Sequence, residues 1–189
     1  MADRRCVIRR RIGALAVVLL AAMGLQSGCS GSAAPAPGVV IRVFAPADRK
    51  DAPDLTGELL DGSGNYRLAD HAGEVVVINF WASWCAPCQA EADDLEATYV
   101  ATKDDKVSFL GINIRDERGT ATTFLVGRAT YPSVFDPSGK LALGFAVAPT
   151  AIPSTVVVDR DGRIAAIANG ALLRDDLEPV VAKLAAESS

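Results

Sequence analysis

The chain has 189 residues, half of them hydrophobic and 22% of them charged, with a formal net charge of −4. This composition is that of a folded protein, and no basic patch or stripe provides an electrostatic basis for nucleic-acid binding. The four cysteines are too few for a fold that depends on disulfide staples, because two of them lie in the first 29 residues.

The first 28 residues have the organisation of a secretory signal peptide. Five arginines make its start basic, and the stretch 12–25 that follows carries no charge. That stretch is too short for a comfortable membrane span and has the length of a signal-peptide core. We expect residues 1–28, with Cys6, to be removed. Because they carry five arginines and one aspartate, the remainder has a net charge of about −8. Arg10-Arg11 also permits twin-arginine export.

A lipid attachment site is predicted at Cys29. The segment Leu25-Gln26-Ser27-Gly28-Cys29 resembles the bacterial lipobox, although Gln26 stands where that motif prefers leucine. One lipid chain would hold the protein on the extracytoplasmic face of the membrane without spanning it; ordinary secretion is the alternative. Residues 29–50 begin with small residues and proline and are predicted to form a flexible tether. Within it, 39–44 could form a short strand.

The remaining residues, 51–189, are predicted to form one α/β domain. A β-hairpin is expected from 55–60 and 65–68, and a second from 154–159 and 164–168 around a tight turn. Further strands are expected at 75–80, 107–114 and 133–135, and helices at 87–102, 120–128, 139–145 and 173–186. This order predicts a layered arrangement with helices on both faces of a sheet.

The motif that indicates chemistry is Cys85-Ala86-Pro87-Cys88. It follows a buried-strand pattern and opens a predicted helix, where unpaired backbone N–H groups and the helix dipole stabilise a thiolate. Proline suits the first helical turn because its missing N–H would have no helical partner there. We expect Cys85 to be the nucleophile, with a lowered thiol pKa, and Cys88 to resolve the mixed disulfide.

Two other readings of the cysteine pair have less support. A zinc site needs four ligands, but the chain has one histidine, His71, and its other cysteines lie in the N-terminal segment. No metal is therefore expected. A purely structural disulfide would constrain the unfolded chain little, because its loop is so short.

Two segments of the chain resemble the thioredoxin superfamily. They are Asn79-Phe80-Trp81-Ala82-Ser83-Trp84-Cys85-Ala86-Pro87-Cys88 and Ile152-Pro153-Ser154-Thr155-Val156-Val157-Val158-Asp159-Arg160-Asp161-Gly162-Arg163-Ile164. Within that superfamily the chain looks like the TlpA/ResA-like branch of extracytoplasmic thiol–disulfide oxidoreductases. The resemblance implies a thioredoxin-like fold with an N-terminal β-hairpin and a strand–helix insertion, expected within 116–148, before the cis-proline strand.

The resemblance also implies roles for residues around the cysteines. Pro153 matches the cis-proline that faces them, and Ile152 before it would offer backbone groups to an extended substrate peptide. The substrate is expected to contact three residues of the motif itself as well: Trp84, Ala86 and Pro87.

A carboxylate lies close to the cysteines in the sequence. Glu91 occupies the position, three after the second cysteine, where ResA-like members carry an active-site glutamate that could accept or relay the proton of Cys88. The alternative is a first-turn glutamate that favours the helix dipole. Asn79 departs from thioredoxin, where an aspartate occupies this place, so the proton needs another route.

The predicted function is reduction of disulfides in exported proteins, with apocytochrome c the substrate that the resemblance suggests. A membrane thiol reductant would supply electrons; no cofactor is expected, and we expect a monomer. The alternatives are an oxidant or isomerase for exported proteins and a non-enzymatic Cu(I)-binding module. A peroxiredoxin is less well supported, because Ala82 stands where it would have Thr or Ser.

Overall fold

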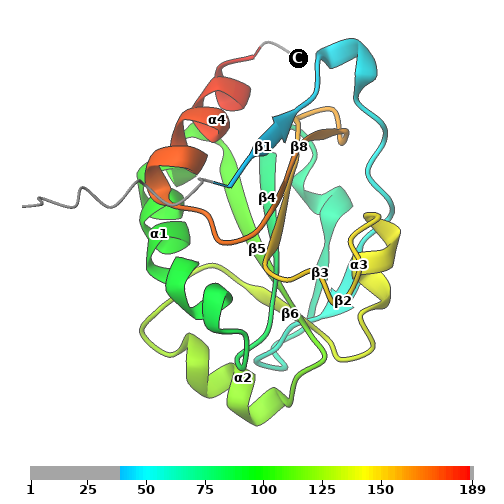
Figure 1. The fold of residues 1–189 in the computed structure, drawn as a ribbon. Helices are drawn as coiled ribbons and strands as arrows, with labels where there is room; N and C mark the ends of the chain where they lie inside the picture. The colour runs from blue at the N-terminus through cyan, green and yellow to red at the C-terminus, as the bar shows by residue number, and fades with distance from the viewer. Residues whose placement is uncertain (1–38, 188–189) are drawn as a thin grey trace, which may run out of the picture. The chain divides into compact units, whose positions relative to one another are not determined.

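The computed structural model describes residues 39–187, in which a six-stranded sheet has the order β1-β8-β7-β4-β5-β6 (Figure 1). A separate two-stranded hairpin is formed by β2 and β3. The strands are β1 (Ile41–Val43), β2 (Thr56–Glu58), β3 (Asn65–Arg67), β4 (Val75–Trp81), β5 (Val107–Ile114), β6 (Ser133–Asp136), β7 (Ser154–Val158) and β8 (Ile164–Asn169).

Four α-helices accompany these strands in the described part of the chain: α1 (Ala86–Thr102), α2 (Arg118–Leu125), α3 (Lys140–Gly144) and α4 (Arg174–Ala186). Short 3-10 turns lie at Pro46–Asp48, Leu68–His71 and Lys103–Asp105. None of these helices is long and apolar enough to cross a membrane.

Strand β4 is central, and all seven of its residues are buried. It pairs in parallel with β5 and antiparallel with β7, and side chains of two cores cover its faces, as the apolar run 75–78 predicts. Its side chains alternate between two cores. Val75 and Val77 pack with α1 and α4 on one face, whereas Ile78 and Phe80 pack on the other with α3 and the β2–β3 hairpin (Figure 1).

The predicted α/β thioredoxin-like fold, with its N-terminal hairpin and helices on both faces, is confirmed. The predicted insertion within 116–148 is confirmed as well and consists of α2, β6 and α3. Helix α2 ends at Leu125, earlier than predicted. The chain leaves the helix through Gly127, whose φ of 73° is in the left-handed region that glycine adopts without strain.

The predicted tether is too long. Residues 41–43 form β1, which pairs antiparallel with β8 and makes one edge of the sheet. Val39 and Ile41 also pack against the core that contains α4. The alternating apolar residues of 39–44 therefore belong to the domain, which extends at least to Val39. Residues 29–38, Cys29 and the predicted signal peptide 1–28 lie outside the described residues.

The contacts of one arginine, Arg49, hold residues 44–50 against the domain. Arg49 donates to Asp159 at 3.1 Å and to both carboxylate oxygens of Glu187, at 2.7 and 2.9 Å. Its side chain is only 2% exposed, and that of Asp159 only 6%. The guanidinium thus joins the N-terminal segment, the β7–β8 turn and the residue after α4, and it lowers the pKa of Glu187.

We predict that Arg49→Ala destabilises the domain. The substitution removes from the buried Asp159 the closer of its two cations, Arg163 remaining at 3.3 Å, and loss of one partner from such a pair costs several kcal/mol when both are fully buried. Since Glu187 is partly exposed, we expect a loss of about 2 kcal/mol in the free energy of unfolding, measured with urea. The control is Arg174→Ala, which removes an exposed ion pair with Glu178 and should barely move the midpoint. Equal midpoints for the two variants would contradict the prediction.

Candidate functional site

The two cysteines lie where β4 ends and α1 begins. Cys85 is the N-cap residue of α1, and the backbone N–H of Cys88 donates to its Sγ atom at 3.2 Å. The two residues are joined by a disulfide, with 5.2 Å between their Cα atoms. Because Pro87 lies in the first helical turn, where its missing N–H has no helical partner, the motif fits the start of the helix as predicted.

The disulfide is largely covered, but its neighbours are exposed. Cys85 and Cys88 are 5% and 3% exposed, whereas Trp84 is 54% exposed, and Ala86 and Pro87 are exposed as well. The cysteines pack in a small apolar cluster contributed by the β2–β3 region, the end of β4, α2, β6 and the segment before β7: Leu60, Trp81, Ala82, Ala121, Phe124, Leu125, Phe135 and Ile152. The three residues of the motif that are predicted to contact the substrate are therefore all exposed, whereas the cysteines beside them are buried.

The Ile152–Pro153 peptide bond is cis, as predicted. Pro153 is buried, and Ile152 packs against the cysteine cluster. The Pro153 carbonyl accepts a hydrogen bond from Gly170 at 2.8 Å, while the backbone of Ile152 has no such partner among the described residues. The structure thus brings Ile152 to the cysteines and leaves its backbone groups unpaired.

Glu91 is buried on the inner face of α1 and is 1% exposed. Its Oε1 atom accepts from Asn79 Nδ2 at 2.8 Å, and its Oε2 atom accepts from the backbone N–H of Leu172 at 2.9 Å. Burial raises its pKa to about 7, although both hydrogen bonds act in the opposite direction. Asn79 also donates to Thr155 at 3.2 Å. Glu91 therefore links α1, β4 and the segment before α4, and it is not a solvent-exposed residue of the first turn.

A small cavity lies between Cys88 of the disulfide and Asn79, the amide that donates to Glu91. Its volume is about 10 Å³, the lower limit for one water molecule. Cys88 and Asn79 both line it, together with Trp81, Leu95 and residues of the α2–β6 region. A single water at this place would lie between Cys88 and the amide that binds Glu91.

The sequence analysis missed Asp116, which holds the loop before the cysteines. Its carboxylate accepts from the backbone N–H and hydroxyl of Ser83 at 2.5 and 2.9 Å and from the amide of Asn113 at 2.9 Å. It also accepts from the backbone N–H of Glu117 and the hydroxyl of Thr120. Burial raises the pKa of Asp116, but these hydrogen bonds outweigh it and the net pKa is lowered. The predicted strand–helix–strand order could have pointed to Asp116. It implies that β4 and β5 are parallel, so that the residues after each strand meet at one edge of the sheet.

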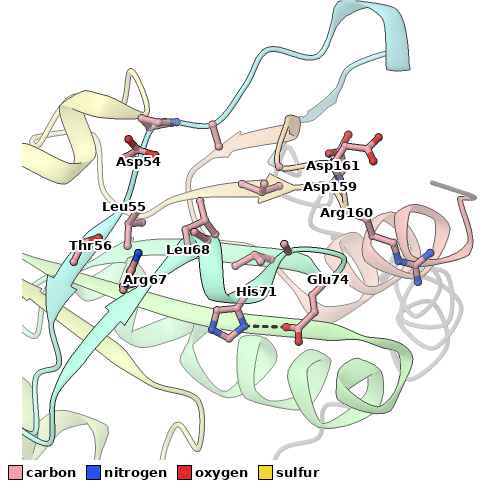
Figure 2. Close-up of a pocket in the computed structure, with 17 residues that line it drawn as sticks. Asp54, Leu55, Thr56, Arg67, Leu68, His71, Glu74, Asp159, Arg160 and Asp161 are labelled. Carbon is pink, nitrogen blue, oxygen red and sulfur yellow. Dashed lines mark hydrogen bonds and ion pairs between the residues drawn. The ribbon is translucent and has the colours of Figure 1, made fainter.

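A larger hollow of about 470 Å³ lies at the other end of β4 (Figure 2). It is lined by apolar residues and by charged groups of both signs, among them Arg67, Asp161 and the His71–Glu74 pair, whose Nδ1 and Oε2 atoms are 2.9 Å apart. No cluster of three or more metal-ligating side chains occurs in residues 39–187. His71 precedes β4, whereas the cysteines follow it, so the structure does not bring them together.

Comparison with known proteins agrees with this geometry. The AhpC/TSA family matches residues 49–167. The thiol–disulfide oxidoreductase ResA of Geobacillus kaustophilus is 30% identical over 129 residues, which are 67% of this chain and 72% of that protein. The thiol:disulfide interchange protein HelX of Rhodobacter capsulatus is 36% identical over 129 residues, 67% of this chain and 70% of HelX.

A solved structure is similar over an even larger part of the chain. A secreted thiol–disulfide isomerase from Corynebacterium glutamicum superposes with a TM-score of 0.74 and 32% identity. The match covers 78% of this chain and 92% of that one.

We predict that Glu91 makes stability fall as the pH rises. Its pKa is about 7 in the folded protein against 4.5 for an unperturbed glutamate, so between these values the folded state binds more protons than the unfolded state. The contribution is fully present below pH 4.5 and is lost by about pH 7, a change of about 3 kcal/mol at most. Glu91→Gln removes it, because the amide does not titrate.

The measurement is urea unfolding of the oxidised protein at a series of pH values between 4 and 8. The free energy of unfolding of the wild type, relative to that of Glu91→Gln, should decrease as the pH rises from 4 to 8. Asp93→Asn removes a carboxylate from the exposed face of α1 and is the control for the loss of one charge. Parallel curves for wild type and Glu91→Gln would contradict the prediction.

Proposed function

Because the chain belongs to the AhpC/TSA family and is a thiol–disulfide oxidoreductase of the ResA type, we propose that it reduces disulfides of exported proteins outside the cytoplasmic membrane. The proposal rests on the spatial arrangement of the disulfide, the cis-proline segment and the exposed residues around them. A disulfide at a helix N-terminus lies in one cluster with Ile152, which precedes a cis-proline, and is bordered by exposed residues that can meet a protein chain. Apocytochrome c is the substrate that we propose.

The proposed reaction has two exchange steps. The Cys85 thiolate attacks one sulfur of the substrate disulfide, whose S–S bond breaks, and the substrate's other sulfur leaves as a thiolate and takes up a proton. Cys88 then loses its proton and attacks Cys85, which releases the second substrate thiol and forms the Cys85–Cys88 disulfide. The substrate gains two electrons and two protons. A membrane thiol reductant would return the pair to its reduced form.

The proposed substrate contacts are Trp84, Ala86, Pro87 and Ile152. The first three are exposed beside Cys85, and the unpaired backbone of Ile152 can pair with an extended substrate segment as an added strand would. This contact needs no particular side chain in the substrate, so it suits an enzyme that acts on several proteins.

Glu91 is the group that we propose to accept the proton of Cys88. With a pKa of about 7 it can take up and release a proton near neutral pH. Cys88 and Asn79 line the same small cavity, and Asn79 is bonded to Glu91. Because the amide of Asn79 does not itself relay a proton, we propose that water passes the proton from Cys88 around Asn79 to the carboxylate of Glu91.

The proposed location rests on the N-terminal segment. We propose that residues 1–28 direct export, that Cys29 is lipidated, and that the tether comprises only 29–38. The thiol–disulfide isomerase of Corynebacterium glutamicum is itself described as secreted, which supports a location outside the cytoplasm.

The direction of electron flow is tested by the reduction potential. Equilibration of the protein with thiol–disulfide buffers should give a value near the reducing end of the range from about −270 to −120 mV. The reduced protein should then also reduce an oxidised peptide that contains the CxxCH sequence of apocytochrome c. A potential near the oxidising end, with no reduction of the peptide, would replace the proposal with that of an oxidant or isomerase.

The role of Glu91 is tested by Glu91→Gln in rapid-mixing kinetics. We expect resolution of the mixed disulfide by Cys88 to slow by about 10- to 100-fold, because the proton acceptor is lost. Attack by Cys85 should be preserved or slightly faster, since removal of a nearby negative charge favours its thiolate. Asp93→Asn again serves as the control. An unchanged resolution rate would leave Glu91 with a structural role only.

A further inference from the structure

Arg115 lies at the edge of the sheet where the cysteines are. It directly follows β5, and its backbone has a φ of 53°, in the left-handed region that residues other than glycine, asparagine and aspartate seldom adopt. Such conformations persist where surrounding contacts hold them, and they cluster at functional sites. The residue is also exposed.

Two contacts join Arg115 to Trp84, the residue before the nucleophile. The backbone carbonyl of Arg115 accepts a hydrogen bond from the indole N–H of Trp84 at 2.9 Å. The guanidinium lies over the same indole ring, 5.8 Å from its centroid, where the face of the ring attracts a cation. The left-handed turn therefore places both the backbone and the charge of Arg115 against Trp84.

Asp116 holds this turn in place. Its carboxylate bonds to Ser83, directly before Trp84, and to Asn113 in β5. The loop that leads to the cysteines and the turn that carries Arg115 are thus joined at Ser83 and at Trp84. These contacts position Arg115 relative to Trp84 without using its guanidinium hydrogen-bond donors.

The guanidinium is free for a ligand. Among the described residues it has no ion pair and no hydrogen bond, although Glu117 is close in sequence. Arg118, by contrast, is bonded to Glu58 and to two backbone carbonyls. Asp116 cannot serve as the counter-ion without losing the hydrogen bonds that already hold it. Arg115 is therefore an unpaired cation held beside Trp84, the residue that precedes the nucleophile.

We propose that Arg115 determines substrate preference by binding a carboxylate of the substrate protein close to the disulfide that Cys85 attacks. A guanidinium binds a carboxylate through two parallel hydrogen bonds, which orients it as well as attracting it. The inference rests on the proposed function, because it concerns the protein substrates of the same cysteines.

Because the domain is acidic overall, we expect Arg115 to favour one acidic residue near the substrate cysteine and not an acidic protein as a whole. Residues 39–187 carry a net charge of about −8, which disfavours an acidic partner as a whole. Charges more than about 8 Å apart are largely screened at physiological salt. One carboxylate in contact with Arg115 is attracted strongly, whereas a uniformly acidic protein is not, so the expected partner has a single acidic residue beside its cysteine.

The test uses two sets of three disulfide-bridged peptides. Within a set the peptides differ only in one residue, Glu, Gln or Lys, which lies two positions before one cysteine in the first set and two positions after it in the second. The measured quantity is the second-order rate constant with which the reduced wild-type protein reduces each peptide at physiological salt. At one of the two placements, the Glu peptide should react about 2- to 5-fold faster than the Gln peptide, and the Lys peptide more slowly than both. High salt should reduce the difference.

Variants of Arg115 separate local recognition from general effects. Arg115→Ala should remove the preference, Arg115→Glu should reverse it, and Arg115→Lys should keep most of it because the cation remains. Arg42→Ala is the matched control: Arg42 is another exposed arginine over an aromatic ring, Phe44, but it lies on the edge strand β1. It changes the net charge by the same amount and should leave the preference intact.

Each result decides the proposal. If Arg115→Ala slows all three peptides equally, or shifts the pH dependence of Cys85 alkylation without changing the preference, Arg115 acts on the thiol and the proposal is wrong. If wild type shows no preference, it is wrong as well. If the reduced protein reduces no peptide, the proposed reductase role fails, and the preference is read from oxidation of the reduced peptides by the disulfide form.

Discussion

The burial of β4 between β5 and β7 is the constraint on which the site depends. Its parallel partner β5 ends at the same edge of the sheet and brings Arg115 and Asp116 to the loop before Cys85. Its antiparallel partner β7 begins at that edge and brings the Ile152–Pro153 peptide bond. Segments far apart in the sequence therefore meet at the N-terminus of α1 because hydrogen-bonded strands fix their register.

Much of this arrangement follows from the sequence, because it depends on local patterns. The apolar run of 75–78 predicts a strand covered on both faces, and a CxxC motif with proline predicts a helix that starts at the cysteines. The cis Ile152–Pro153 bond was predicted by the resemblance of two short segments. These features need only neighbours in the chain, or a motif, to be recognised.

The features that were missed depend on pairs of residues far apart in the chain. Arg49 reads as an ordinary surface residue of a tether, and only its contacts with Asp159 and Glu187 show that its segment belongs to the domain. Likewise, the sequence left Glu91 open between an active-site glutamate and a first-turn residue, and its burial becomes evident only from its contact with Leu172, 81 positions later, whose backbone N–H donates to it. Helical periodicity predicts apolar residues on the buried face of a helix and so does not identify Glu91 as buried. The charge can be buried because one amide and one backbone N–H donate to its carboxylate.

Two carboxylates near the cysteines differ in their protonation because their surroundings differ. Asp116 is only partly buried and accepts five hydrogen bonds from protein donors, so its charged form is favoured and it serves as a fixed anchor. Glu91 is buried and accepts two, which do not offset its desolvation, so its pKa of about 7 suits proton exchange. Environments that move two acids in opposite directions can separate a structural role from a proton-transfer role. In this fold, the number of donors that each carboxylate meets is set by its place. Asp116 lies in a turn at the surface, and Glu91 lies on the buried face of α1, the helix that begins at the cysteines.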